Sequence, residues 1–306
     1  MLRRRVIQSS AGTGYRVPGT GYRVRTLAPG TWHLAPRTWH PAPSPLIPSA
    51  IVPTVPAAPA DSPVLDRRSV VIYVSAVVLL VVFEYFALPG RFLRTAWPDR
   101  IVAWWGEDAS QYKVLLGYQY WGVASLVLRL LIPAVLIGFV LRERPRAFGF
   151  RLRGQWSQLR PYLIAFGVMI PVVYTISALS SFQAKYPLYD FAVLGGWHFW
   201  GFHLFYGLQF LGLEAFFRGY ILFGLYPRLG NHAVAVMMIP YVMIHFGKPL
   251  PETLSAIVAG FVLGYLALKS KSFLWGWMLH WSVAFTMDVM VIGREFGFGN
   301  VWGILF

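Results

Sequence analysis

From Ser69 to the C-terminus, the chain is a series of long apolar segments separated by short polar ones. An α-helix of about 20 mostly apolar residues is long enough to cross a bilayer, and most of these segments reach that length. The chain is therefore predicted to be an all-α, polytopic membrane helix bundle. The predicted spans, about seven in number, are residues 69–88, 117–141, 161–181, 198–226, 233–247, 253–268 and 273–292.

The composition favours a membrane protein over a soluble domain. Of the 306 residues, 57% are apolar and 17% are aromatic, whereas only 13% are charged. A typical soluble domain has about 25% charged residues. The lipid bilayer is thus the first expected partner. The chain also has no cysteine, which excludes thiol catalysis, disulfide bonds and metal sites built on thiolates.

The excess of positive charge follows the ends of the apolar segments. The formal net charge is +15, and nine Arg and two Asp lie within residues 1–68, up to the first span. Residues 142–160 hold six Arg, and residues 269–272 hold two Lys. Basic loops of this kind set the orientation of membrane helices, so no nucleic-acid partner is expected. With seven spans, the three basic regions fall on one side, which predicts a cytoplasmic N-terminus in the plasma or inner membrane.

Residues 1–66 differ from the rest of the chain. The segment GTGYRV occurs at 12–17 and again at 19–24. The region is rich in Pro and Gly and shows neither a helical nor a strand period, so it is predicted to be a disordered extension. Its tandem repeat is also what translated upstream sequence would show, with the real start nearer Asp66. The membrane-embedded domain is expected to comprise residues 67–306.

Two charged residues, Glu214 and Arg218, stand inside the fourth apolar segment in the stretch LGLEAFFRGY. Charged groups at membrane depth are costly and usually mark a site of function. The two residues are four positions apart and therefore share one face of a helix. An ion pair whose members only neutralise each other would have the same spacing, so this pair alone leaves both interpretations open.

Two histidines at a similar depth favour a functional site. His245 ends the fifth segment, and His280 lies in the seventh. Counted from the inner ends of their segments, Glu214, His245 and His280 are 12, 12 and 7 residues deep. These counts correspond to depths of roughly 18, 18 and 11 Å. Three ionisable side chains from three helices are therefore expected to meet within about two helical turns of one another.

The other polar residues of the spans are weaker candidates. His203 lies about three turns from Glu214 on nearly the same helix face, where it would line an access path or belong to an interfacial belt. Asp288 follows His280 on the same face and is expected either to be a second carboxylate or to lie near the outer water. Polar residues at span ends need no functional explanation, and these are His198, His232 and Glu252.

Three segments together resemble the CPBP family of intramembrane proteases, which comprises the type 2 CAAX prenyl proteases and the bacteriocin-processing, or Abi, proteins. The segments are EAFFRGYILF from residue 214, YVMIHF from residue 241 and LWGWMLHWSVAF from residue 274. That family carries Glu-Glu-x-x-x-Arg, Phe-x-x-x-His and His-x-x-x-Asn motifs on three membrane helices. The similarity covers about residues 160–292 and implies a protease core there that acts on a membrane-associated protein or peptide.

The chain departs from the family motifs at two polar positions. Alignment on Arg218 places the first Glu of the pair at Leu213, so that only the second remains, as Glu214. The Asn of the third motif is replaced by Ala284, and the Phe of the second motif by Tyr241. In the family, the first Glu is the residue assigned to water activation and the second is linked to the Arg. The departures therefore fall on positions of the chemistry.

The resemblance implies that water cleaves a peptide bond with Glu214 as the remaining base, Arg218 as its partner, and His245 and His280 stabilising the oxyanion. A divalent metal such as zinc is an alternative, with Glu214, His245 and His280 as its ligands. The two losses favour a second hypothesis, a catalytically silent membrane scaffold or immunity protein. An active endopeptidase is preferred, because a scaffold gains little from three buried ionisable groups.

Overall fold

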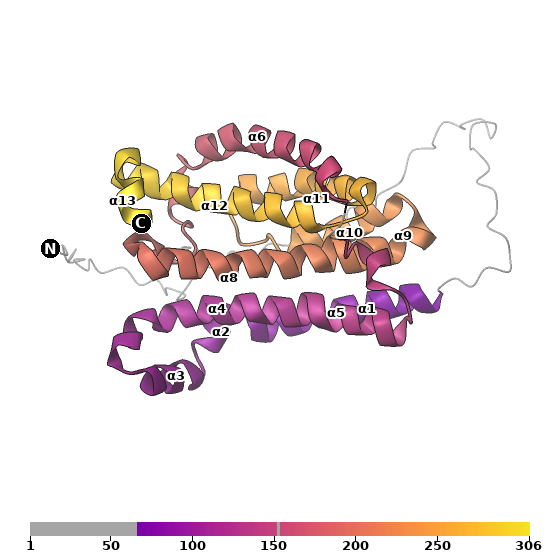
Figure 1. Ribbon diagram of the computed structural model, residues 1–306, viewed down its shortest axis with the longest axis horizontal. Helices are drawn as coiled ribbons and strands as arrows, with labels where there is room; N and C mark the ends of the chain where they lie inside the picture. Colours follow the sequence, from indigo (N-terminus) through magenta and orange to yellow (C-terminus); the bar gives the residue numbers. More distant parts are fainter. Residues whose placement is uncertain (1–65, 152–153) are drawn as a thin grey trace, which may run out of the picture. The chain divides into compact units, whose positions relative to one another are not determined.

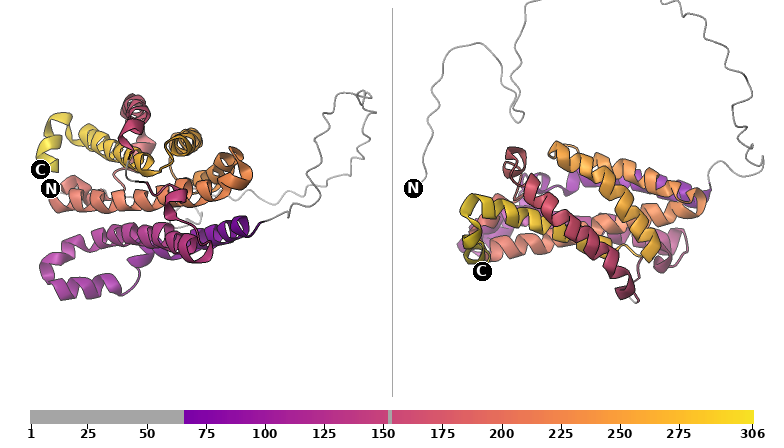
Figure 2. Two further views of the ribbon diagram at one scale, coloured as in Figure 1. Left: turned by 45° about the vertical axis from the view of Figure 1, so that its right-hand side comes forward. Right: turned by 90° about the horizontal axis from the view of Figure 1, so that it is seen from above.

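A computed structural model describes residues 66–151 and 154–306, and the regular structure within these two ranges is entirely helical. The predicted all-α fold is confirmed. The prediction of a disordered extension falls, apart from Asp66, on residues outside the described ranges. Figure 1 shows how the helices are arranged, and Figure 2 gives two further views of them.

Each of the seven predicted segments forms a helix or a run of consecutive helical elements. In order, these are α1 (Arg67–Val82) with η2 (Phe83–Ala87); α4 (Lys113–Leu126) with η4 (Val127–Leu131), α5 (Ile132–Val135) and η5 (Leu136–Val140); α6 (Leu159–Ile176); α8 (Gly196–Glu214) with η9 (Ala215–Phe223) and α9 (Gly224–Leu229); α10 (His232–Met243); α11 (Leu250–Ser270); and α12 (Leu274–Phe296). Shorter helices are α2 (Pro89–Phe92), α3 (Trp97–Trp105) and α7 (Ser180–Gln183), which lie in connections, and α13 (Val301–Leu305), which follows α12.

Five helices in the described part of the chain are long and apolar enough to cross a membrane, judged by length and composition. They are Arg67–Ala87, Asp108–Val140, Trp156–Ile176, Gly196–Leu229 and Leu250–Ser270. The helix α10 has only 12 residues, as expected from its short apolar segment. The helix α12 has 23 residues but carries Asp288, Arg294 and Glu295 and is not among the five. The chain is thus a multi-pass membrane protein, and the count of seven spans stays a prediction.

The first helix begins at a well-defined cap. The backbone N–H of Ser69 donates to Oδ1 of Asp66 over 2.9 Å, and the Ser69 hydroxyl donates to Oδ2 over 2.8 Å. An Asp at this position satisfies an N–H group that the helix leaves without a partner. The same bonds hold the pKa of Asp66 below its usual value, because they stabilise the charged carboxylate. Asp66 therefore caps α1, which begins at Arg67.

The helix formed by α8, η9 and α9 is the centre of the membrane domain. In its apolar window 83% of the residues are buried, against 11–39% in the other four candidate spans. It packs against α4 on one side and α12 on the other, and it lies between these helices in Figure 1. Glu214 and Arg218 therefore belong to the helix that is best shielded from lipid.

A glycine allows α8 to approach α4 closely. A Cβ atom added to Gly212 would lie 2.5 Å from both the carbonyl oxygen and Oγ of Ser125 in α4. The Ser125 hydroxyl in turn donates to the carbonyl of Gln209 in α8, over 2.9 Å. Small residues commonly permit such close packing between membrane helices. The glycine thus sets the spacing of the helix that carries Glu214.

Replacing Gly212 by alanine is expected to lower the free energy of unfolding by about 1–3 kcal/mol, because the backbone of α4 must move to admit the methyl group. Gly138→Ala is the matched control, since nothing lies within 4 Å of a Cβ atom added there. Thermal unfolding in detergent measures both. Equal midpoints for the two variants would contradict the close approach of α4 and α8.

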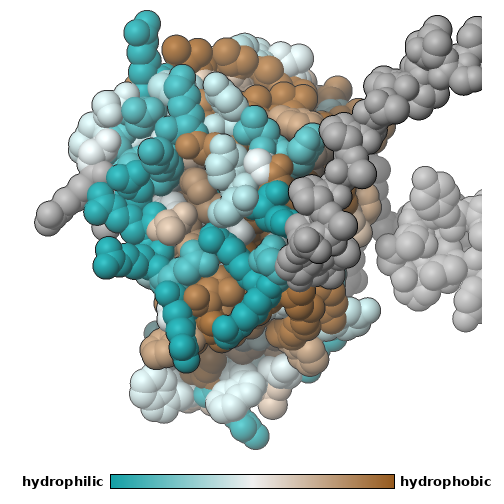
Figure 3. Space-filling model, turned by 90° about the vertical axis from the view of Figure 1, so that its right-hand side faces the viewer, coloured by the Kyte–Doolittle hydropathy of each residue, from teal (hydrophilic) through white to brown (hydrophobic). Residues whose placement is uncertain are grey.

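The basic loops gather at one end of the membrane domain, which Figure 3 views end-on with many hydrophilic side chains in sight. Nη2 of Arg67 donates to the carbonyl of Val140, over 3.2 Å, and the hydroxyl of Ser272 donates to the carbonyl of Arg151, over 3.1 Å. These contacts join the start of α1, the loop after η5 and the loop before α12. Exposed basic residues in these regions are Arg67, Arg142, Arg144, Arg146, Lys269 and Lys271.

Candidate active site

The ion pair expected from the four-residue spacing is formed. Glu214 ends α8, and Arg218 follows one turn later in η9, a π-helical stretch. Both side chains have an exposed fraction of 0%, so Arg218 does not reach the membrane surface. Nη1 of Arg218 donates to Oε1 of Glu214 over 3.0 Å, and the guanidinium lies 3.8 Å from the centre of the Tyr241 ring. π-Helical turns recur at functional sites, where they redirect side chains.

His280 contacts the same carboxylate oxygen from α12. Its Nδ1 lies 2.9 Å from Oε1 of Glu214. An ionised carboxylate only accepts hydrogen bonds, so Nδ1 carries the proton and Nε2 keeps its lone pair. Gly276, one turn earlier in α12, permits this approach, because a Cβ atom there would lie 3.1 Å from Oε2 of Glu214. Glu214 thus fixes both the orientation and the tautomer of His280.

His245 reaches the same region from the end of α10. Its Nδ1 lies 2.8 Å from the carbonyl oxygen of Tyr241, to which it donates, so its Nε2 is also an acceptor. The ring of Tyr241 packs edge-on against His245, with centroids 4.8 Å apart, and against His280, with centroids 6.3 Å apart. Tyr241 therefore links the two imidazoles. Glu214 touches His280 directly, and no direct contact joins it to His245 among the described residues.

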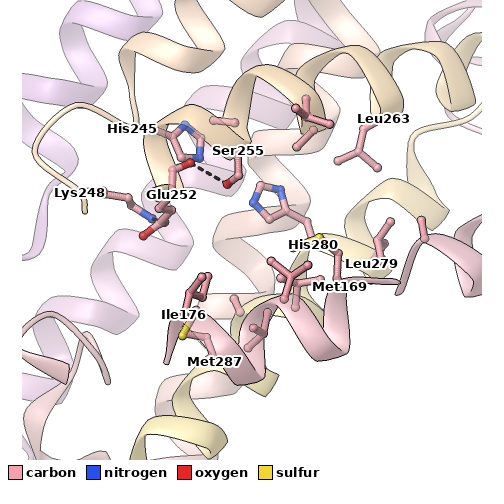
Figure 4. Close-up of a pocket in the computed structure, with 18 of the residues that line it drawn as sticks. Met169, Ile176, His245, Lys248, Glu252, Ser255, Leu263, Leu279, His280 and Met287 are labelled. Atoms are coloured by element: carbon pink, nitrogen blue, oxygen red, sulfur yellow. Dashed lines mark hydrogen bonds and ion pairs between the residues drawn. The ribbon is translucent and has the colours of Figure 1, made fainter. Parts of the chain in front are cut away.

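Both histidines line a cavity of about 540 Å³. Figure 4 shows His245 and His280 pointing into it, with Leu263 and Leu279 beyond His280. Most of the wall is aliphatic and comes from α6, α11 and α12; it includes Val168, Met169, Val172, Leu263, Leu279 and Met287. Glu214 and Arg218 do not belong to the wall. The cavity would suit an apolar segment placed beside the imidazoles.

A polar cluster that the sequence analysis did not single out lies at the His245 side of the cavity (Figure 4). Nζ of Lys248 donates to Oε1 of Glu252 over 2.6 Å, and the hydroxyl of Tyr186 donates to Oε2 over 2.6 Å. Burial raises the pKa of Tyr186 well above its usual value, which keeps the hydroxyl protonated. Glu252 was set aside as a span-end residue. The only sequence signal for the cluster was the four-residue spacing of Lys248 and Glu252.

The three side chains predicted as zinc ligands are not assembled as a ligand set. Within residues 66–151 and 154–306, no three His, Asp or Glu side chains are grouped so that they could hold a metal ion. The reason is local: Oε1 of Glu214 accepts from Arg218 and His280, and its Oε2 faces Gly276. Nδ1 of His245 is bonded to its own helix. These residues do not fit a three-ligand zinc site, and no step below uses a metal.

The two departures from the family motifs lie in different surroundings. Leu213 is buried in the apolar core with neighbours such as Phe217 and Ile221, and it is not part of the cavity wall. Ala284 does belong to the wall, one turn after His280, and offers no polar group there. Relative to the family motifs, the cavity wall therefore lacks one polar side chain, at Ala284, and α8 lacks another, at Leu213.

Residues 195–286 match the family model described as type II CAAX prenyl endopeptidase Rce1-like. This confirms the resemblance to the CPBP family of intramembrane proteases. No curated protein and no solved structure matches the chain significantly. The matched region runs from the start of α8 into α12, so it includes Glu214, Arg218, His245 and His280 and ends just before Asp288.

Proposed function

We propose that the chain is an intramembrane endopeptidase in which His280 is the general base and Glu214 positions it. The observation that carries the proposal is the 2.9 Å contact between Nδ1 of His280 and Oε1 of Glu214, made by a histidine that lines the cavity. A carboxylate behind an imidazole is the arrangement that prepares the opposite nitrogen to accept a proton. The match of residues 195–286 to a family model of endopeptidases supports the same reaction.

The sequence suggested Glu214 as the general base, but we assign this role to His280 for a steric reason. Glu214 is fully buried and absent from the cavity wall, so a substrate in the cavity does not reach it. Arg218 donates directly to its carboxylate, over 3.0 Å. Glu214 is therefore a positioning residue, and Arg218 holds it in place. The first Glu of the family motif, lost at Leu213, is not required for this arrangement.

The proposed reaction uses the Nε2 atoms of His280 and His245, which carry no proton in the tautomers described above. Water in the cavity gives a proton to Nε2 of His280, while its oxygen forms a bond to the carbonyl carbon of the peptide. The resulting imidazolium is stabilised by Glu214 through Nδ1–H, and it then gives the proton to the leaving amine nitrogen as the C–N bond breaks. Nε2 of His245 accepts the second hydrogen of the water and so orients it. The substrate is a membrane-associated protein or peptide with apolar side chains around the cleaved bond.

The orientation of the protein follows from its basic end. Arg67, Arg142 and Lys269 belong to the basic end of the domain, which faces the cytoplasm under the rule that basic loops stay inside. The N-terminus is then cytoplasmic, and the protein lies in the plasma or inner membrane. In the domain organisation that we propose, the membrane domain comprises residues 67–306 and its protease core residues 160–292.

A catalytically silent scaffold is the second candidate, and one observation favours it. Ala284 stands on the cavity wall where the third motif has a polar side chain, and it cannot stabilise developing charge. A silent protein would keep the fold and the apolar cavity without turnover. The two candidates differ in one measurable property, the cleavage of peptides by the wild-type protein in a bilayer.

Replacing His245 by alanine is expected to lower the cleavage rate by about 10- to 100-fold, because the attacking water loses one of its two acceptors. The assay uses the protein in proteoliposomes with membrane-inserted peptides that carry a donor and a quencher around an aliphatic segment. His232→Ala is the matched control, since His232 is exposed at the start of α10. Unchanged cleavage by His245→Ala would remove His245 from the site, and a wild type that cleaves no peptide would favour the scaffold.

A further inference from the structure

A second pair of ionisable side chains joins the two helices that carry Glu214 and His280. Nε2 of His203 in α8 lies 3.5 Å from Oδ2 of Asp288 in α12, and the exposed fractions of the two side chains are 1% and 0%. Neither residue belongs to the cavity wall. Phe199, Phe202 and Phe285 surround the His203 ring, with centroids 4.4, 5.1 and 4.8 Å away. The pair is therefore sealed from both substrate and water.

The two side chains approach each other as an ion pair without forming a hydrogen bond. Both ring nitrogens of His203 and both carboxylate oxygens of Asp288 are buried, none of the four makes a hydrogen bond among the described residues, and Nε2 and Oδ2 are 3.5 Å apart. Burying one such group without the other is costly, whereas two apolar groups in their place would fill the same space cheaply. An interface that needed only stability would therefore not require this pair.

The pair and the candidate active site lie along one interface. In α8, His203 precedes Glu214 by 11 residues, or about 16 Å. In α12, Asp288 follows His280 by 8 residues, or about 12 Å, so the contacts match those of two antiparallel helices. A further contact joins the same two helices, because Nε1 of Trp277 in α12 donates to the carbonyl of Gly207 in α8 over 2.8 Å. If α12 slid along α8, the His203–Asp288 contact and the Glu214–His280 contact would break together.

We infer that His203 and Asp288 are positioning residues: they fix the register of α12 against α8 and thereby the contact that orients His280. This inference rests on the proposed function. The pair adds to the register that side-chain packing and the Trp277–Gly207 hydrogen bond already favour, because a shift along the helix axis would leave two buried polar groups without each other. The pair acts through Glu214 and His280 and does not touch the substrate.

The test separates stability from positioning with two double variants. In the apolar pair, His203→Leu with Asp288→Leu, the melting temperature is expected to stay within about 5 °C of the wild type. Its kcat for cleavage is expected to fall about 10- to 100-fold, with KM unchanged, because His280 is misplaced. In the polar pair, His203→Gln with Asp288→Asn, a neutral hydrogen bond replaces the contact, and kcat is expected to stay within about threefold of the wild type.

Cleavage by the apolar pair at the wild-type rate would overturn the inference, and so would a polar pair that loses as much activity as the apolar pair. A readout without substrate keeps the result separate from the proposed function. The proton on Nδ1 of His280, bonded to Glu214, is observed by NMR of protein with labelled histidine in detergent micelles. Its resonance is expected in the wild type and the polar pair and is expected to be lost in the apolar pair. Retention of the resonance in the apolar pair would also overturn the inference.

Discussion

His280→Ala is expected to lower the cleavage rate by about 10²–10⁴-fold, the usual contribution of a positioned general base. The variant removes the cavity-lining group that is hydrogen-bonded to Glu214. The fold should survive, because the His280 side chain is still 17% exposed and alanine is accepted in a helix. Initial rates in proteoliposomes measure the effect, with the melting temperature recorded alongside.

The matched control for His280→Ala is again the exposed His232→Ala, which should cleave like the wild type. Glu214→Gln adds a second control on the mechanism, since it keeps the shape of the side chain but removes the charge that stabilises the imidazolium. It should lose much of the rate as well. If His280→Ala cleaved at the wild-type rate, another group would have to be the base and the proposed chemistry would be contradicted.

Arg218→Met is expected to lower the free energy of unfolding by about 3–5 kcal/mol, the cost of leaving a buried charge without its ionic partner. Arg218 and Glu214 both have an exposed fraction of 0%, and the guanidinium is packed on Tyr241. Methionine fills much of the volume of arginine but cannot pair with Glu214. Thermal unfolding in detergent measures the loss.

The exposed Arg160→Met is the control for Arg218→Met, and it should change the midpoint little. Combining Arg218→Met with Glu214→Gln removes both charges and is expected to recover part of the lost stability. An Arg218→Met protein as stable as the wild type would mean that the pair is not buried in the membrane domain, against the geometry described above.

The helical architecture could be predicted from apolar periodicity and length. All seven segments contain a helix, because a stretch of apolar residues in a bilayer must satisfy its backbone internally. The meeting of Glu214 and His280 could also be predicted, since their depths along the helices were comparable. Depth is set by counting residues from a span edge, and it needs no knowledge of the tertiary structure.

The roles within the site could not be predicted in this way. Counting along the axis does not say which side chain faces the cavity, and Glu214 turns out to lie behind His280. The π-helical stretch η9, which begins directly after Glu214, changes the angular spacing of the residues that follow. Glu252 does lie in the first turn of α11, as its span-end position suggested, but the sequence did not show that it also lines the cavity.

The buried pair of His203 and Asp288 illustrates the same limit. Their sequence positions suggested an access path or an interfacial belt for His203, and a second carboxylate or the outer water for Asp288, yet both side chains are buried and neither lines the cavity. Their contact depends on the antiparallel packing of α8 and α12, which neither segment reveals alone. Buried polar groups of this kind become visible only when two helices are placed side by side.

The most direct test of the central claim is cleavage of a membrane-inserted peptide by the wild-type protein in proteoliposomes made up in water enriched in oxygen-18. Mass spectrometry of the products identifies the cut and the isotope content of the new carboxyl group. We predict a cut within the aliphatic segment and one heavy oxygen in the new C-terminus, because water is the nucleophile. Intact peptides throughout, from a folded protein, would contradict the proposed endopeptidase.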